Sequence, residues 1–353
     1  MFQEGDQTDV VNLMNLIFSR ARFDVRLWSW KYKSAPRGFL AVVAELDGKI
    51  VGHMGLQLVD MKVGKNVITG SQACDLCVHP DYLRQGMFLA MGKALMKAAS
   101  ENEVLLTYGF PNEPAYYGHL KYGWFDVAMI QNLVTYLDTH KVAIGQFKIL
   151  NRIEPLIEKS SKFIDWLLSR RRRYSHPSIE NLELTTISRF DESVDQLWSE
   201  TSKNLGIAVV RDHRYMNWRY MSRPDIRYSV FIAKKNRQVE GYIVFFARKS
   251  GDRNVGHIVD ILGASKDALL CLINAVIADL SRQHVDSIRC WMQSGFLEYN
   301  ALREMGFIPS FASSFVPKGV RGRLIARINS KAIFQPYKDA KKWYVTSGDS
   351  DLV

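Results

Sequence analysis

The chain has 353 residues, 47% of them hydrophobic, and a formal net charge of +11 at pH 7. This length suits two domains, and the apolar content excludes a chain that is disordered throughout. No apolar run reaches the roughly 18 residues of a membrane span, and the N-terminal sequence MFQEGDQTDV is acidic, so we expect neither a membrane span nor a signal peptide. The basic excess favours anionic partners of any kind, and no recognisable nucleic-acid module accompanies it.

The first predicted strands lie in residues 39–59, FLAVVAELDGKIVGHMGLQLV, with a turn at Gly48. The strand that follows contains Cys74 and Cys77, whose spacing is found in redox and metal motifs. Side chains alternate along a strand, so we expect these two thiols on opposite faces. A second pair of metal ligands is missing, and the four cysteines do not form a disulfide framework for a chain of this size. We therefore expect no metal and a reduced, cytoplasmic protein.

Residues 77–96, CVHPDYLRQGMFLAMGKALM, are the most informative segment. A short β-like run and His79-Pro80 precede Arg84-Gln85-Gly86, which opens a predicted helix. Gly86 has no Cβ and permits a tight turn, after which free backbone N–H groups at the helix N-terminus would face a phosphate. An ordinary strand–turn–helix connection would have the same pattern. The helix itself is indicated by apolar residues at helical spacing, namely Met87, Met91, Ala94, Leu95 and Ala98.

This segment resembles motif A of the GCN5-related N-acetyltransferases, the GNAT superfamily, whose Arg/Gln-x-x-Gly-x-Gly/Ala loop holds the pyrophosphate of acetyl-CoA. Downstream, NEPAYYGHLKYGW from Asn112 resembles the closing motif of the family, and residues 39–59 look like its second and third strands. The resemblance covers about residues 1–135, with all motifs in order. Two loop positions depart from the pattern, because Leu83 replaces the first Arg/Gln and Phe88 replaces the final Gly/Ala.

The resemblance implies acyl-CoA, either acetyl-CoA or a longer acyl-CoA, as the co-substrate. In the family, backbone N–H groups of a distorted strand hold the pantetheine and polarise the thioester carbonyl. The side chain of Phe88 can point into the sheet while its amide faces the phosphate. The implied acyl-CoA-binding residues are Leu76, Cys77, Val78, Arg84, Gln85, Gly86, Met87, Phe88 and Asn112.

Four residues are candidates for proton transfer. His119 stands where the family has its protonating tyrosine, and it would protonate the thiolate or accept the amine proton. A helix histidine bonded to solvent is the alternative, and the neighbouring Tyr116 or Tyr117 could substitute. Asp75 is the best carboxylate for a general base. Its counterpart Asp260 lies in a half without a CoA loop, which favours a structural role for Asp75.

That counterpart belongs to an internal repeat. The sequence WKYKSAP at 30–36 recurs as WRYMSRP at 218–224, an offset of 188, and residues 39–52 match residues 228–241. Further on, Asp75-Leu76 matches Asp260-Ile261, and LKYGW at 120–124 matches REMGF at 303–307. Order and direction are kept, which indicates duplication. We predict an α/β fold of two tandem GNAT domains, each a mixed, mostly antiparallel twisted sheet flanked by helices.

The second copy lacks the chemistry of the first. Its sequence GASKDALLCLINAV contains no His-Pro and no glycine loop, and Asp267 near the helix start would oppose a phosphate.

The basic cluster Arg170–Arg173 ends an amphipathic segment that either packs as a linker helix or touches a membrane or an acidic partner. The predicted organisation is an acyl-CoA-binding domain at 1–140, a helical linker at 141–184, a degenerate domain at 185–330 and a tail at 331–353.

The acceptor amine is the part of the reaction that the sequence specifies least. Aromatic and acidic residues in the tail KKWYVTSGDSDLV suit the stacking and ion pairing of an amino sugar, and they equally suit an unstructured acidic terminus. Tandem proteins of this kind resemble bacterial enzymes that acylate nucleotide-linked amino sugars for surface polysaccharides, and the basic excess would help to hold a diphosphate. The candidate substrate residues are Trp30, Tyr32, Tyr108, Trp343 and Asp349.

We therefore expect a cytoplasmic CoA-dependent N-acyltransferase, a monomer or homodimer with no nucleic-acid partner. The amine would attack the thioester directly in a ternary complex, without a covalent enzyme intermediate. An acetyltransferase for aminoglycosides or polyamines is one alternative. A non-catalytic CoA-sensing or interaction protein is the other, supported by Leu83, Phe88 and the degenerate second copy.

Overall fold

The computed structural model describes residues 1–18, 23–138, 182–310, 322–330 and 337–351. Most of the predicted linker at 141–184, including Arg170–Arg173, lies outside these ranges. Within them, no helix is both long and apolar enough to cross a membrane. The chain divides into two compact units, each discontinuous in sequence. Unit 1 consists of Met1–Met129, Leu205–Asp225 and Val316–Trp343, and unit 2 of Ile130–Asn204, Ile226–Phe315 and Tyr344–Val353.

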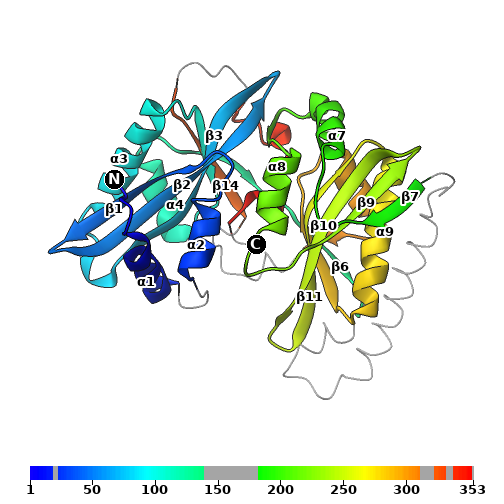
Figure 1. The fold of residues 1–353 in the computed structure, drawn as a ribbon, viewed down its shortest axis with the longest axis horizontal. Coiled ribbons are helices and arrows are strands. Elements are labelled where there is room, and N and C mark those ends of the chain that lie inside the picture. The colour runs from blue at the N-terminus through cyan, green and yellow to red at the C-terminus, as the bar shows by residue number, and fades with distance from the viewer. Residues whose placement is uncertain (19–22, 139–181, 311–321, 331–336, 352–353) are drawn as a thin grey trace. The chain divides into compact units, whose positions relative to one another are not determined.

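The core of unit 1 is a mixed sheet (Figure 1). Among its described strands, β3 and β4 form the one parallel pair, and the other neighbours are antiparallel. Its order is β1 (Phe39–Leu46), β2 (Lys49–Val63), β3 (Asn66–Val78), β4 (Leu106–Gly109), β14 (Arg323–Ile328) and β5 (Phe125–Met129), with β8 (Ile207–Val209) paired to β2. The helical segments of unit 1 are α1 (Gln7–Ile17), α2 (Val25–Lys31), α3 (Met87–Glu101), α4 (Glu113–Leu120), α8 (His213–Met216), a π-helical turn at Asn217–Met221, and single 3-10 turns at Pro80–Tyr82 and Ala340–Lys342.

Helices cover both faces of this sheet because its strand residues alternate in direction. Val42 packs in a core cluster with α3 and α4, whereas the adjacent Val43 packs in a second cluster with α1 and α2. The same alternation places Met54 of β2 in the α3 cluster. The sheet is therefore buried on both sides, and a ligand must approach it from an edge or an end.

Unit 2 contains a sheet of the same design, with β11 and β12 as its parallel pair. Its order is β13 (Ile308–Pro309), β6 (Asn132–Tyr136), β12 (Ser287–Trp291), β11 (Arg253–Gly263), β10 (Gln238–Ser250), β9 (Ser229–Lys235) and β7 (Leu182–Thr186). Its helical segments are α7 (Ser193–Thr201), α9 (Lys266–Arg282), α10 (Leu297–Glu304), and 3-10 turns at Ser202–Asn204 and Ser347–Asp349. Two mixed α/β sheets flanked by helices confirm the predicted fold class.

Each sheet includes strands from the other half of the sequence, β8 and β14 in unit 1 and β6 in unit 2. In unit 1, β14 lies between β4 and β5, and in unit 2, β6 lies between β12 and β13. The division predicted from the sequence places residues 132–136 in the first domain and residues 323–328 in the second, so the structure differs from it at both strands. A local pattern predicts a strand but not its partner, and the two copies offer equivalent places for it.

The repeated Trp-x-Tyr motifs meet within unit 1. Trp30 and Trp218, which the offset of 188 makes equivalent, stack with ring centroids 5.4 Å apart. The indole Nε1–H of Trp30 donates to the Trp218 carbonyl at 2.8 Å, and that of Trp218 donates to the Trp30 carbonyl at the same distance. Such reciprocal contacts are the mark of a local two-fold relation, and they support the duplication.

Candidate functional site

The strand β3 contains a bulge at Asp75. His53 and Gly55 of β2 are opposite Cys77 and Cys74, so β3 carries one residue more than β2 between these pairs. Asp75 has a φ of 51°, in the left-handed region that aspartate adopts more readily than most residues. The extra residue shifts the alternation of the side chains. Cys74 and Cys77 therefore pack in the same cluster with α1 and α2, and the prediction of opposite faces is wrong.

Beyond the bulge, β3 has an open backbone edge. Its parallel ladder with β4 runs from Gly70↔Leu106 to Ala73↔Gly109, while its ladder with β2 continues to Val78. Among the strand pairs that the structure describes, residues 74–78 therefore pair on the β2 side only. The predicted acyl-CoA-binding residues Leu76, Cys77 and Val78 lie in this stretch, and the backbone groups that face away from β2 are placed to bind an extended ligand.

The predicted phosphate loop follows this edge. Arg84 and Gly86 both have positive φ angles, 63° and 80°, and α3 begins at Met87 with Gly86 as its N-cap. Alternating conformations of this kind turn successive backbone N–H groups toward one point, and the helix N-terminus adds its dipole. Arg84, Gln85 and Gly86 are exposed, and the first turn of α3 contains no acidic residue. The loop therefore has the geometry and the charge of an anion site.

Phe88 points into the core, away from this loop. Its ring contacts His119 and Tyr122, at centroid distances of 5.4 and 6.2 Å. A Cβ added at Gly118 of α4 would lie 2.4 Å from Phe88 Cε1, so the glycine makes room for the large side chain. The departure at position 88 is thus accommodated between α3 and α4. Leu83, the other departure, is 55% exposed.

His119 lies at the C-terminal end of α4 and is only 6% exposed. Its Nδ1 is 2.5 Å from the hydroxyl of Tyr122, and its ring lies 4.5 Å from that of Trp124. Burial lowers the pKa of His119 to about 4 and raises the pKa of Tyr122. At neutral pH the imidazole is therefore uncharged, and its Nδ1 shares a hydrogen bond with the hydroxyl of Tyr122. Tyr117, on the same helix, is 59% exposed.

The depressed pKa of His119 predicts a loss of stability in mild acid. In the unfolded chain the imidazole of His119 binds a proton near pH 6.5, whereas in the folded chain its pKa is about 4. The free energy of unfolding should thus fall as the pH decreases through this window, with His119 contributing on the order of 3 kcal/mol. Urea unfolding at several pH values should show a shallower decline for His119→Phe than for the wild type. Equal declines would contradict the assignment.

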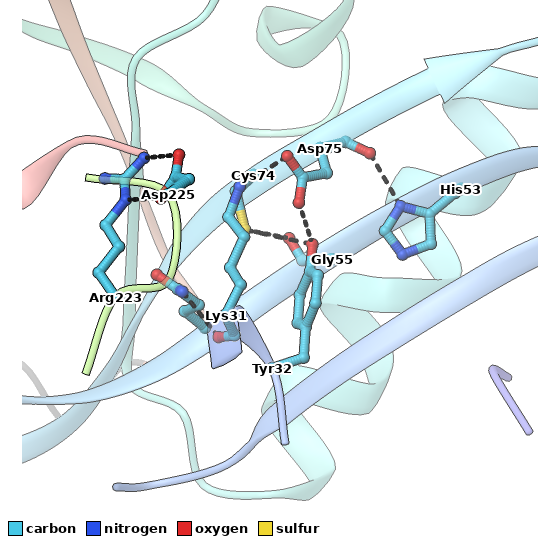
Figure 2. A network of polar contacts seen from close by, with 9 residues as sticks. Lys31, Tyr32, His53, Gly55, Cys74, Asp75, Arg223 and Asp225 are labelled. Carbon is cyan, nitrogen blue, oxygen red and sulfur yellow. Dashed lines mark hydrogen bonds and ion pairs between the residues drawn. The ribbon is translucent and has the colours of Figure 1, made fainter. Parts of the chain in front are cut away.

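Asp75 is the centre of a buried polar network (Figure 2). Lys31 Nζ lies 2.7 Å from its Oδ1, the Tyr32 hydroxyl donates to its Oδ2 at 2.8 Å, and His53 Nδ1 lies 2.9 Å from its backbone oxygen. All four residues are buried. Burial first, and the charge of Asp75 next, raise the pKa of Tyr32, while burial lowers the pKa of His53. His53 is therefore neutral and donates its Nδ1–H to the carbonyl of Asp75.

Sequence reasoning missed Lys31 and His53. The available signal for Lys31 was the repeat, because the basic residue between Trp and Tyr recurs as Arg219 in the second copy. No comparable signal marks His53, which reads as one residue of an ordinary strand. Its role depends on the bulge of the neighbouring strand, and a bulge is not visible in an alternating pattern.

The predicted substrate residues lie inside the two units. Trp30, Tyr32, Tyr108, Trp343 and Asp349 are all buried. The indole of Trp343 donates to the carbonyl of Tyr337 at 2.8 Å, and Asp349 Oδ2 accepts from the backbone N–H of Thr346 at 2.8 Å. Side chains in such positions stabilise cores and turns and offer little surface to a ligand. Asn112, assigned to the CoA arm, accepts from the backbone N–H of Ala115 and caps α4.

In unit 2, the corresponding edge is covered by the chain itself. The strands β11 and β12 pair only from Val255↔Ser287 to Ile258↔Cys290. Beyond this ladder, the hydroxyl of Tyr344 donates to the Ile261 carbonyl, and Glu298 Oε1 accepts from the Gly263 backbone N–H at 3.3 Å. Asp260, the counterpart of Asp75, does not have a positive φ. The second copy therefore lacks both the left-handed bulge residue and the open edge.

Comparison with known proteins agrees with this geometry. Residues 2–125 match the family model described as acetyltransferase (GNAT) domain. No curated protein matches the chain in sequence. Among the described residues, no group of three or more His, Cys, Asp or Glu side chains is arranged to hold a metal ion.

Solved structures of N-acyltransferases resemble the whole fold. A GCN5-related N-acetyltransferase from Anabaena variabilis is 14% identical with a TM-score of 0.64, over 93% of this chain and 71% of that one. A probable N-acyltransferase from Enterococcus faecalis is 12% identical with a TM-score of 0.61, over 93% and 71%. The N-myristoyltransferase of Saccharomyces cerevisiae with bound myristoyl-CoA is 11% identical with a TM-score of 0.58, over 94% and 81%.

These likenesses establish the fold. The family match gives residues 2–125 the acetyltransferase (GNAT) domain expected from the motifs. The predicted enzyme class, an acyl-CoA-dependent N-acyltransferase, is confirmed at the level of this domain. The nucleotide-sugar subtype has no counterpart in these comparisons and stays a prediction.

Proposed function

We propose that the chain is an acyl-CoA-dependent N-acyltransferase with a single acyl-CoA site, formed by the open edge of β3 and the loop before α3. The observation that carries the proposal is the bulge at Asp75, because it lies where β3 leaves β4, on the strand whose end leads through a 3-10 turn to the exposed loop. The pantetheine arm would run along residues 76–78, and the pyrophosphate would lie at the backbone N–H groups of residues 84–88.

The reaction follows from this placement. The amine nitrogen attacks the thioester carbon, the carbon–sulfur bond breaks, the amine loses a proton and the departing thiolate gains one. Backbone N–H groups at the bulge stabilise the negative charge that develops on the carbonyl oxygen. Because the pKa of His119 is about 4, its imidazolium form is scarce at pH 7. We therefore propose the exposed Tyr117 as the proton donor, while His119 and Tyr122 are buried and hydrogen-bonded to each other.

For the acceptor we propose an amino sugar linked to a nucleotide diphosphate. The support is the net charge of +11, since a basic protein favours a substrate that carries a diphosphate. The burial of the five predicted substrate residues removes them from this argument, so the sugar would contact other side chains. A free aminoglycoside is polycationic, and the basic excess disfavours it.

The test is turnover with a panel of amines. The purified chain is incubated with acetyl-CoA and one amine at a time, either a nucleotide-linked amino sugar or a free aminoglycoside. Mass spectrometry follows the acylated product, and a thiol reagent follows released CoA. We expect the wild-type chain to acylate a nucleotide-linked amino sugar and the Gly86→Val variant to acylate none of the amines. Acylation of aminoglycosides alone would contradict the acceptor, and acyl-CoA binding without acylation of any amine would favour the non-catalytic alternative.

A further inference from the structure

The backbone at Asp75 is held by side chains from three separate positions. Lys31 ends α2, Tyr32 follows it, and His53 comes from β2. Lys31 and Tyr32 bind the carboxylate of Asp75, while His53 binds its backbone oxygen (Figure 2). A non-glycine residue in the left-handed region is strained and persists only where its surroundings determine it. The contacts of Lys31, Tyr32 and His53 hold Asp75 in this conformation.

The clamp is built into the neighbouring elements. Gln57 Nε2 donates to the carbonyl of Lys31 at 2.8 Å and fixes the end of α2 against β2. A Cβ added at Gly55 would lie 2.3 Å from the Tyr32 hydroxyl, so that position of β2 leaves room for the hydroxyl to reach Asp75. A buried ion pair gives little net stability, because both charges must leave water. The arrangement at Asp75 is therefore better explained by the geometry it fixes than by the stability it adds.

The same contacts make Asp75 a poor general base. Each carboxylate oxygen already accepts a hydrogen bond, Oδ1 from the ammonium of Lys31 and Oδ2 from Tyr32. The residue is 8% exposed, on the side of the sheet where Tyr32 packs against α1 and α2. Leu76 and Val78, which follow it, pack on the opposite side with α3. The carboxylate and the proposed acyl-CoA edge are thus joined through the backbone rather than through a shared cavity.

We propose that Lys31, Tyr32 and His53 are positioning residues that act through Asp75 to hold the bulge, so that the backbone N–H groups after it face the thioester carbonyl. The inference rests on the proposed function, and it makes Asp75 a positioning residue rather than a base. The degenerate copy agrees, since Asp260 lacks the left-handed conformation and its strand edge is covered by the chain itself.

Three variants separate this role from catalysis and from simple stability. Asp75→Asn keeps one of the two acceptor oxygens and tolerates a positive φ, whereas Asp75→Ala loses both oxygens and adopts a positive φ less readily. Tyr32→Phe removes one hydroxyl and keeps the ring, so it tests the clamp if Asp75→Ala does not fold. Asp260→Asn is the matched control in the second copy. The readout is the infrared carbonyl stretch of bound [1-13C]acetyl-CoA, which reports polarisation at the bulge.

We expect the stretch to lie below the value for free acetyl-CoA in the wild type, Asp75→Asn and Asp260→Asn. In Asp75→Ala and Tyr32→Phe it should return toward the free value, while affinity for CoA itself stays within about threefold. A full shift in Asp75→Ala or Tyr32→Phe, or its complete loss in Asp75→Asn, would overturn the inference alone. Failure of the wild type to bind acetyl-CoA would overturn the proposed function, and this inference with it.

Discussion

Replacing Gly86 with valine is expected to abolish acyl-CoA binding without unfolding the protein. Gly86 has a φ of 80°, and a β-branched residue is strongly disfavoured there. No atom lies within 4 Å of a Cβ built at this position, so the substitution creates no clash with the protein. The valine must instead change the path of the loop, which turns the backbone N–H groups away from the phosphate, or place its methyl groups where the phosphate would lie. We expect affinity to fall at least about 100-fold.

Gly64 provides a matched control for this variant. It lies in the turn between β2 and β3, has a φ of 61°, and also has no atom within 4 Å of an added Cβ. Both valine variants should lose a similar amount of stability, on the order of 1–3 kcal/mol, because each forces a valine into the left-handed region. Only Gly86→Val should lose binding in calorimetric titration with acetyl-CoA. Normal affinity in Gly86→Val would show that the loop before α3 is not the phosphate site.

Residues 1–140 expressed alone are expected to fail to fold into a monomeric acyltransferase domain. Without β14, the strands β4 and β5 lose the partner that lies between them. Leu324, Ile325 and Ala326 of β14 are fully buried, and Ile325 belongs to the core cluster beneath α3. Exposed strand edges and a missing core residue promote association between chains. We expect aggregation or dimerisation in size-exclusion chromatography and no cooperative unfolding of a monomer.

The matched comparison restores the missing strand. A chain that joins residues 1–129, 205–225 and 316–343 through flexible Gly/Ser linkers contains all of unit 1. This chain should unfold cooperatively and bind acetyl-CoA, because it includes β14 as well as β8. A stable monomer of residues 1–140 that binds acetyl-CoA would contradict the importance of the exchanged strand.

The parts of the fold that could be predicted are those encoded locally or by repetition. The loop before α3 was predicted from Arg84-Gln85-Gly86, and the duplication predicted a second sheet of the same design. The exchange of β6 and β14 could not be predicted in this way. Two copies of one pattern give each final strand two equivalent partners, and long-range pairing decides between them.

The position of the site could be predicted from the sequence, but the side chains that hold its backbone could not. The distorted strand was placed at residues 76–78 through the family resemblance, yet strict alternation gave the wrong faces for Cys74 and Cys77 because one extra residue reverses it. The clamp of Lys31 and His53 on Asp75 joins residues from two elements distant in sequence. Such a network depends on tertiary packing, which composition and spacing do not describe.

Acyl-CoA binding by the full chain is the most direct test of the account. Calorimetric titration with acetyl-CoA and with a longer acyl-CoA measures affinity and stoichiometry in one experiment. Among the residues that the structure describes, only unit 1 combines an open strand edge with the left-handed Arg84 and Gly86 before the next helix, while unit 2 covers its own edge, so we predict one site per chain. Two sites per chain would contradict the assignment of unit 2, and binding of neither compound would contradict the proposed function.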